Sequence, residues 1–320
     1  MISRRLLLGA GLAAPFIAHA GASSPGFPER ALRYVCPFPP GATNDNVSRT
    51  MSRALAPRLG VNVIVENKAG AGGAVGSRMV AEAKPDGHVL LNASAGNLTI
   101  APHLSHVGYD PLRDLAPVAL AGEAYGLVAV NPALPVHSIA ELIALGRRRP
   151  GFLNYASAGI GSAGHLRGAL LADEARIEAV HVPFPGSAAA AMSVVAGDSH
   201  VIIDPIAAPH ALEGRLRPLA TLGPDRWDAF PDLPNLAELG IGRNWPGGTW
   251  FGLFAPGGTP APVIARINRD FNDSLAEPEV AAALRRFGLK PEAVAPEELG
   301  RRVAADHAAI GRVLRRLNIA

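Results

Sequence analysis

The fold is decided by the stretch LRYVCPFPPGATNDNVSRTMSRALAPRL, which covers residues 32–59. Residues 32–36 are mainly apolar and β-type, so they predict a buried strand. A turn rich in proline and glycine follows, and residues 45–59 have the apolar spacing of a helix. A strand that passes through a short turn into a helix is the first half of a βαβ unit.

The same alternation continues on the C-terminal side of this stretch and then occurs a second time. The first series adds strands at 61–66 and 88–92, with a helix at 73–84 between them. The second series has strands at 126–130, 153–156, 179–183 and 200–204, separated by helices at 138–147, 162–174 and 187–196. This pattern predicts two mostly parallel sheets with helices on their faces.

Two connections between the series predict two lobes joined by a hinge. Residues 109–118 are interpreted as the first crossing, and residues 245–250 as the return to a strand at 251–256. We therefore expect lobe 1 to contain 29–120 and 250–320, and lobe 2 to contain 121–249. Helices predicted at 262–275, 278–287 and 296–317 are expected to pack on lobe 1.

The first twenty residues have the pattern of an export signal. Arg4 and Arg5 precede an apolar run at 6–14, and Ala18-His19-Ala20 matches a cleavage site. The apolar run is too short to span a bilayer. The pattern predicts a signal peptide at 1–20, a spacer at 21–28 and a periplasmic protein. The paired arginines also resemble a twin-arginine signal, so both export routes stay open.

Composition argues against several classes of function. The formal net charge is +3, and loss of Arg4 and Arg5 would leave +1. Proteins that bind nucleic acids usually carry a larger positive charge, so this class is not expected. Cys36 is the only cysteine, so no intrachain disulfide can form, and we expect it to be buried in a strand. The ten histidines lack metal-binding spacing, so no metal and no cofactor are expected.

Small polar residues follow the predicted strands at the edge where open α/β sheets bind ligands. Thr43, Asn44 or Asp45 can cap the first helix, whose N-terminal N–H groups attract anions. Ser94 and Asn97 follow the third strand. These loops predict a site for a small anion, and the alternative for the first loop is a simple turn with a cap.

Three further loops are candidates in the second series. Gly159, Gly161 and Gly164 form a G-x-G-x-x-G pattern between a strand and a helix, but no acidic residue follows the next strand to bind a ribose. We therefore interpret the glycines and Ser162 as an anion-binding loop. Gly186 and Ser187 end the next strand. Asp204 ends another, where it either caps a helix or accepts hydrogen bonds from a ligand.

A serine hydrolase is the alternative from another class. Ser94 and Ser157 each precede Ala-Gly, as in G-x-S-x-G, although the first glycine is missing in both. His165 and Asp204 are conceivable partners, but this acid follows the histidine, unlike the order in α/β-hydrolases.

Several motifs together resemble the Bug (TctC-type) periplasmic solute-binding proteins of tripartite tricarboxylate transporters. They lie at 37–41 with Asp45 and Arg49, and at 65–73, 84–88, 109–111, 182–186 and 250–256. The resemblance implies a two-lobed type II periplasmic binding protein fold that closes on one small carboxylate. Carried over to this chain, it implies ligand contacts from Phe38, Gly41, Thr43, Asp45, Ser94, Asn97, Ser157, Gly161, Ser162, His165, Gly186, Ser187 and Asp204.

The resulting hypothesis is an exported receptor with no catalytic activity. It would bind a dicarboxylate, tricarboxylate, amino acid or aromatic acid and present it, as a monomer, to membrane transporter subunits. A ligand sensor in a signalling system is a further alternative. Because the cleft loops contain no arginine, we expect helix N-termini and waters to recognise the charge, with Arg49 or Arg167 adding to it from the side.

Overall fold

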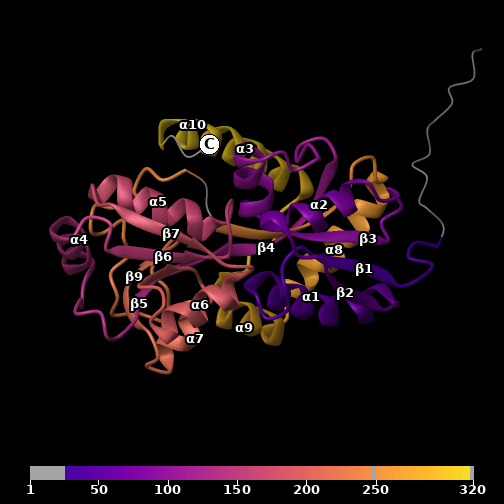
Figure 1. Ribbon diagram of the computed structural model, residues 1–320. Coiled ribbons are helices and arrows are strands. Elements are labelled where there is room, and N and C mark those ends of the chain that lie inside the picture. Colours follow the sequence, from indigo (N-terminus) through magenta and orange to yellow (C-terminus); the bar gives the residue numbers. More distant parts are fainter. Residues whose placement is uncertain (1–25, 247–248, 318–320) are drawn as a thin grey trace, which may run out of the picture.

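The structure is a computed structural model that describes residues 26–246 and 249–317. The predicted signal peptide and most of the spacer lie outside these ranges. The described chain forms two α/β lobes side by side (Figure 1). The two-lobed fold predicted from the sequence is thereby confirmed. No helix in the described ranges is long and apolar enough to cross a membrane.

Lobe 1 is built on a six-stranded sheet with the order β11-β4-β10-β3-β1-β2. Its strands are β1 (Leu32–Cys36), β2 (Val63–Asn67), β3 (Val89–Ser94), β4 (Leu115–Ala124), β10 (Thr249–Pro256) and β11 (Leu289–Lys290). Its helices are α1 (Thr43–Leu59), α2 (Ala74–Ala81), α3 (Ala101–Leu104), α8 (Ala261–Leu275), α9 (Pro278–Arg286) and α10 (Pro296–Leu317), with short turns η1 (Ala71–Gly73) and η2 (Gly96–Ile100).

Helices cover both faces of this sheet because its strands carry apolar residues on both faces. In β10, Phe251 and Leu253 face the core under α1 and α8, whereas Trp250 and Phe254 face the core under α2 and α10. Cys36 is buried at the end of β1, as predicted.

Lobe 2 is built on a five-stranded sheet with the order β7-β6-β8-β5-β9. Its strands are β5 (Gly126–Val130), β6 (Leu153–Ser157), β7 (Ala179–Pro183), β8 (Val201–Ile203) and β9 (Arg217–Leu222). Its helices are α4 (Ile139–Arg148), α5 (Ala163–Ala175), α6 (Ser187–Ala196) and α7 (Ala207–Leu212).

Each sheet is mixed, which differs from the mostly parallel sheets that the sequence predicts. The βαβ units pair in parallel, as β1 does with β2 and β3, and as β6 does with β7 and β8. The strands that connect the lobes run the other way: β10 is antiparallel to β3 and β4, and β5 to β8 and β9. In lobe 1 the difference arises because β10, which returns from lobe 2, lies between β3 and β4. In lobe 2 it arises because β5, which enters from lobe 1, lies between β8 and β9.

The last helix reaches both lobes. Along the top of Figure 1, α10 extends from above α3 to above α5. Ile310 and Leu314 of α10 pack with Ile100 of lobe 1 and with Leu166 and Leu170 of α5. The prediction that this helix packs on lobe 1 therefore holds for only part of its contacts, because its apolar stripe continues onto lobe 2.

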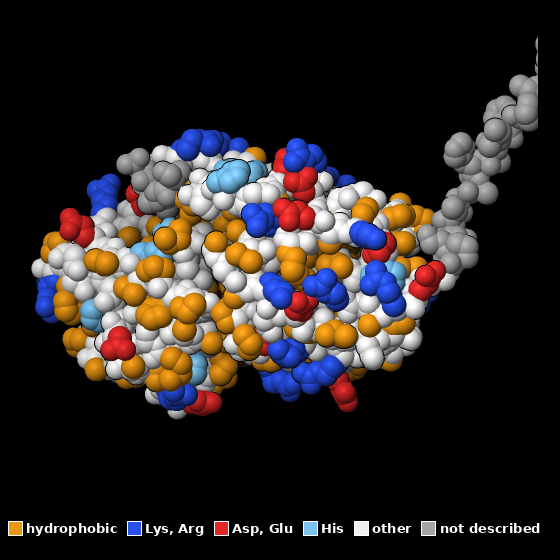
Figure 2. Space-filling model, turned by 45° about the vertical axis from the view of Figure 1, so that its right-hand side comes forward, with side chains coloured by type: hydrophobic (Ala, Val, Ile, Leu, Met, Phe, Trp, Pro, Cys, Tyr) orange, Lys and Arg blue, Asp and Glu red, His pale blue; other side chains and the backbone are white. Residues whose placement is uncertain are grey.

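Charged side chains of both signs lie next to one another on the lobe 1 face in Figure 2. Lobe 1 also has exposed ion pairs, such as Arg113 with Asp114 and Arg30 with Asp86. Such pairs contribute little to stability, so the fold depends on its apolar cores.

Candidate functional site

A narrow cleft between the lobes lies at the carboxyl ends of β1, β3, β6 and β8. It encloses a cavity of about 40 Å³ and has one wall from each lobe. Such strand ends are where open α/β sheets bind ligands. Lining residues from lobe 1 and its return strand are Phe38, Ala42, Thr43, Asn44, Ser94, Gly96, Thr249 and Phe251; those from lobe 2 are Ala158, Ser162, Ala163, Arg167, Ser187, Ile203, Asp204 and Pro205.

Three helices begin at this cleft, and their N-termini converge on it from both lobes. Helix α1 begins at Thr43, α6 at Ser187 and α5 just after its N-cap Ser162. The Thr43 backbone N–H donates across the cleft to Ser187 Oγ over 3.2 Å. The first N–H groups of a helix have no intrahelical acceptor, so these ends favour an anion or an acceptor oxygen.

Two buried polar atoms on the lobe 1 wall lack hydrogen-bond partners in the described part of the chain. They are Thr43 Oγ1 and Asn44 Nδ2, in residues that are only 4% and 6% exposed. A buried polar group without a partner destabilises the protein. A ligand with acceptor oxygens in the cleft would provide the missing hydrogen bonds.

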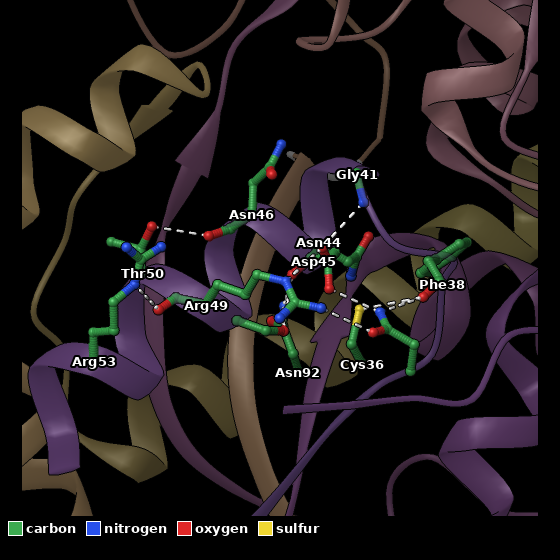
Figure 3. A network of polar contacts seen from close by, with 12 residues as sticks. Cys36, Phe38, Gly41, Asn44, Asp45, Asn46, Arg49, Thr50, Arg53 and Asn92 are labelled. Carbon is green, nitrogen blue, oxygen red and sulfur yellow. Dashed lines mark hydrogen bonds and ion pairs between the residues drawn. The ribbon is translucent and has the colours of Figure 1, made fainter. Parts of the chain in front are cut away.

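Asp45 does not line the cavity and instead fixes the loop beside it. Figure 3 shows its carboxylate between Gly41 and Arg49. It accepts hydrogen bonds from Gly41 N (3.0 Å), Arg49 Nε (2.9 Å) and Asn67 Nδ2 (2.8 Å). Burial opposes its ionisation, but these donors together lower the pKa of Asp45. Asn67 Nδ2 also donates to Phe38 O, so the network holds the loop that carries Phe38.

Asn97 also lies behind the cleft wall, where it fixes the position of Ser94 by hydrogen bonds. Its Oδ1 accepts from Ser94 N (2.7 Å) and Ser94 Oγ (2.9 Å), while its Nδ2 donates to Ser77 Oγ. The amide is fully buried and lies outside the cavity wall. Asn97 is therefore placed to orient Ser94 at the cleft.

The glycine-rich loop brings lobe 2 against lobe 1. Gly159 and Gly161 have φ of 114° and 79°, values that side-chain-bearing residues rarely adopt. A Cβ on Gly161 would lie 2.9 Å from Ala101 Cα of lobe 1. Gly186 makes a similar approach, because its Cβ would lie 3.2 Å from Pro39 Cδ. Both glycines thus permit close contact between the lobes.

Ser157 and two histidines form a cluster behind this loop. Ser157 Oγ lies 2.6 Å from His181 Nε2 and also accepts from Gly159 N. The His181 ring stacks on that of His165 with centroids 4.0 Å apart. Burial and the neighbouring His165 lower the pKa of His181 to about 4, so its ring is neutral at pH 7. None of the three residues lines the cavity.

Asp204 and Arg167 carry opposite charges on the lobe 2 side of the cleft. Burial raises the pKa of Asp204 to about 6, although Ile206 N, Arg167 and the nearby Thr43 hydroxyl favour its ionised form. Arg167 lies on α5, and it is absent from the set of contacts that the family resemblance implies. From the sequence, Arg167 is expected only to contribute from the side. Helical spacing places it more directly, because Ala163 and Arg167 share one face of α5 and both line the cleft.

The structure therefore divides the predicted site residues into two groups. Those that line the cavity are Phe38, Thr43, Ser94, Ser162, Ser187 and Asp204. Those that lie behind the wall or between the lobes are Gly41, Asp45, Asn97, Ser157, Gly161, His165 and Gly186. Within the described ranges, no group of three or more acidic, histidine or cysteine residues is arranged to bind a metal ion.

The chain is similar to known proteins along most of its length. The family model described as "Tripartite tricarboxylate transporter family receptor" matches residues 47–319. The chain is 34% identical over 291 residues to Protein BugT of Bordetella pertussis, with 88% of this chain and 89% of BugT covered.

Two solved structures with small acids are also similar. One is a protein of R. palustris solved with adipate, at 31% identity and a TM-score of 0.87, with 92% of this chain and 99% of the other covered. The other is MatC from Rhodopseudomonas palustris with bound malate, at 31% identity and a TM-score of 0.84, with 90% and 100% covered.

Proposed function

Because the chain belongs to the tripartite tricarboxylate transporter family of receptors, we propose that it binds a small carboxylate in the cleft between its lobes. The observation that carries the proposal is the convergence of three helix N-termini on a cavity with unpartnered donors at Thr43 and Asn44. Similar structures contain adipate and malate, which supports a carboxylate as the ligand.

Binding would operate through closure of the lobes on the ligand. The Thr43–Ser187 hydrogen bond and the close approaches of Gly161 and Gly186 belong to a closed arrangement. A carboxylate that contacts both walls favours this arrangement by its higher affinity for it. Because closure excludes water from the cleft, the hydrogen bonds to the carboxylate oxygens become stronger.

The predicted contact residues have two roles in this proposal. Phe38, Thr43, Ser94, Ser162, Ser187 and Asp204 would touch the ligand, because they line the cavity. The remaining predicted residues would position them or allow closure, as Asn97 does for Ser94 and Gly161 does for the lobe contact. The sequence predicts lobe boundaries at 120/121 and 249/250. As part of the same proposal, we place the first boundary at Tyr125, between β4 and β5, and the second between β9 and β10.

The proposed receptor acts outside the cytoplasm. The export pattern of residues 1–20 and the family of periplasmic receptors support this location. Its partners would be the small carboxylate and, transiently, the membrane subunits of a transporter. A monomer suits this role, because each copy must present its own cleft.

A thermal-shift screen of the mature protein from Gly21 tests the function. The panel contains succinate, malate, adipate, citrate, aspartate, glutamate, nicotinate and terephthalate. A ligand that binds only the folded state stabilises it by about 2.7 kcal/mol at a hundredfold excess over Kd. We expect a clear rise in Tm with one chemical class. No shift with any acid, in protein shown by mass spectrometry to carry no ligand, would contradict the proposal.

One contact favours the alternative of an exported serine hydrolase. Ser157 Oγ and His181 Nε2 are within hydrogen-bond distance, as in a nucleophile–base pair. However, Ser157 is buried outside the cavity, and no carboxylate within the described ranges orients His181. Incubation with a fluorophosphonate separates the two functions: covalent labelling of Ser157 or Ser94 would support the hydrolase, and the receptor should remain unlabelled.

A further inference from the structure

Arg167 places an unpaired cation at the back of the cleft. It lies on α5 and lines both the cleft and a second, larger cavity of about 390 Å³ beside the hinge. Its Nη1 lies 2.7 Å from the position that a Cβ on Gly126 would occupy, so the guanidinium fills space left by a glycine at the crossing between the lobes. Within residues 26–246 and 249–317, it makes no hydrogen bond and no ion pair.

The half-buried guanidinium of Arg167 favours an anionic partner. Burial lowers the pKa of Arg167 to about 10, with the charge of Asp204 acting only as a partial counterweight. A guanidinium has five donors and matches a carboxylate in a bidentate pair. Arg167 is half-buried, so a guanidinium that lacks such a partner loses part of its hydration without replacing those hydrogen bonds.

Resting on the proposed function, we propose that Arg167 forms a direct ion pair with a carboxylate of the ligand. Arg167 is then a specificity-determining residue that requires an acidic group at the hinge end of the ligand. The unpartnered donors Thr43 Oγ1 and Asn44 Nδ2 on the opposite wall receive the acceptor group at the other end. The favoured ligand therefore carries a carboxylate in lobe 2 and a second anionic or acceptor group near α1.

The charges in the two cavities indicate which side of Arg167 the carboxylate occupies. The hinge cavity is lined by Glu123 and Asp306, and burial raises the pKa of both carboxyl groups. Additional negative charge there is disfavoured. The cleft contains one acidic side chain, Asp204, together with the start of α1 and several hydroxyl groups. The ligand carboxylate is expected on the cleft side.

The experiment measures binding of malate, adipate and succinate by titration calorimetry to wild type, Arg167→Met and Arg167→Lys. Loss of a charge-assisted pair should weaken binding by about 10- to 100-fold in Arg167→Met, with partial recovery in Arg167→Lys. Without ligand, Arg167→Met should have a slightly higher Tm than wild type, because it removes a half-buried charge that has no ion-pair partner in the described ranges. Arg148→Gln, at an exposed position of α4, is the matched control and should change neither quantity.

Two further measurements separate an ion pair from a purely structural role. Gly126→Ala keeps the charge but crowds Nη1, so it should weaken binding of the same acids while Arg167 remains present. Succinamate, in which one carboxylate of succinate is an amide, should bind wild type at least tenfold more weakly than succinate, and Arg167→Met should lose this preference. If wild type binds an acid and Arg167→Met binds it with the same affinity, this inference is wrong but the proposed function stands. If wild type binds none of the acids, both the inference and the proposed function are wrong.

Discussion

At the scale of single residues, the strand pattern predicts which side chains lie at the cleft better than it predicts their hydrogen-bond partners. Ser94 and Ser187 line the cleft because the carboxyl ends of parallel strands meet there, which the sequence pattern indicates. The sequence does not reveal that Asp45 accepts a hydrogen bond from Asn67, or that Asn97 donates one to Ser77. Those contacts depend on distances between segments that only the folded chain brings together.

The buried Asp204 predicts a pH dependence of stability. Its folded pKa of about 6 exceeds its unfolded value of 3.8, so its stabilising effect is present below pH 4 and is lost as pH rises through 6. The loss is on the order of 2–3 kcal/mol. Asp204→Asn should therefore gain stability relative to wild type between pH 4.5 and 7.5, as measured by urea denaturation. Asp232→Asn, at an exposed loop position, is the control, and parallel profiles for Asp204→Asn and wild type would contradict the prediction.

At the scale of elements, predictions succeed where periodicity is regular and fail where proline or glycine interrupts it. The helices α1, α5 and α6 lie within two residues of their predicted starts. The sequence does not predict β4 or β9, because β4 contains Pro117 and Gly122 and β9 contains Pro218. Each proline lies where no strand needs its missing N–H group. Pro218 is in β9, which is an edge strand, and Pro117 is at the opposite end of β4 from the residues that pair with β11.

Two helices with the same N-cap test whether helix ends serve binding. Ser162 Oγ accepts from His165 N (3.3 Å) at α5, and Ser138 Oγ accepts from Glu141 N (3.1 Å) at α4. Each serine-to-alanine change should reduce the free energy of unfolding by about 1 kcal/mol. Only Ser162→Ala should also weaken malate binding, because α5 begins at the cleft and α4 does not. Equal affinities for the two variants would show that the Ser162 hydroxyl has no part in binding.

At the scale of the whole molecule, the lobes are held together by contacts that no single lobe contains. Residues of η2 in lobe 1 touch the glycine-rich loop of lobe 2, and α10 packs on both lobes. The sequence predicts two lobes from its repeated pattern, but it does not show how closely they approach. That closeness depends on glycines whose missing side chains leave room for the opposite backbone.

Gly96 is the position where this closeness can be tested most directly. A Cβ there would lie 3.2 Å from Gly161 O and 3.4 Å from Ser162 Cα of the opposite lobe, and Gly96 has no positive φ to strain a substitution. Gly96→Val should therefore act as a wedge that disfavours the closed arrangement but leaves each lobe folded. We expect wild type to become more compact in small-angle X-ray scattering when malate or adipate is added.

The wedge variant should keep its expanded profile at the same ligand concentration and bind at least tenfold more weakly. Gly96→Ala, with a smaller side chain, should lie between the two, because the neighbouring backbone can yield by a few tenths of an ångström. Compaction of Gly96→Val to the wild-type extent would mean that the ligand binds without the lobe contact. The contact between η2 and the glycine-rich loop would then be unnecessary for ligand binding.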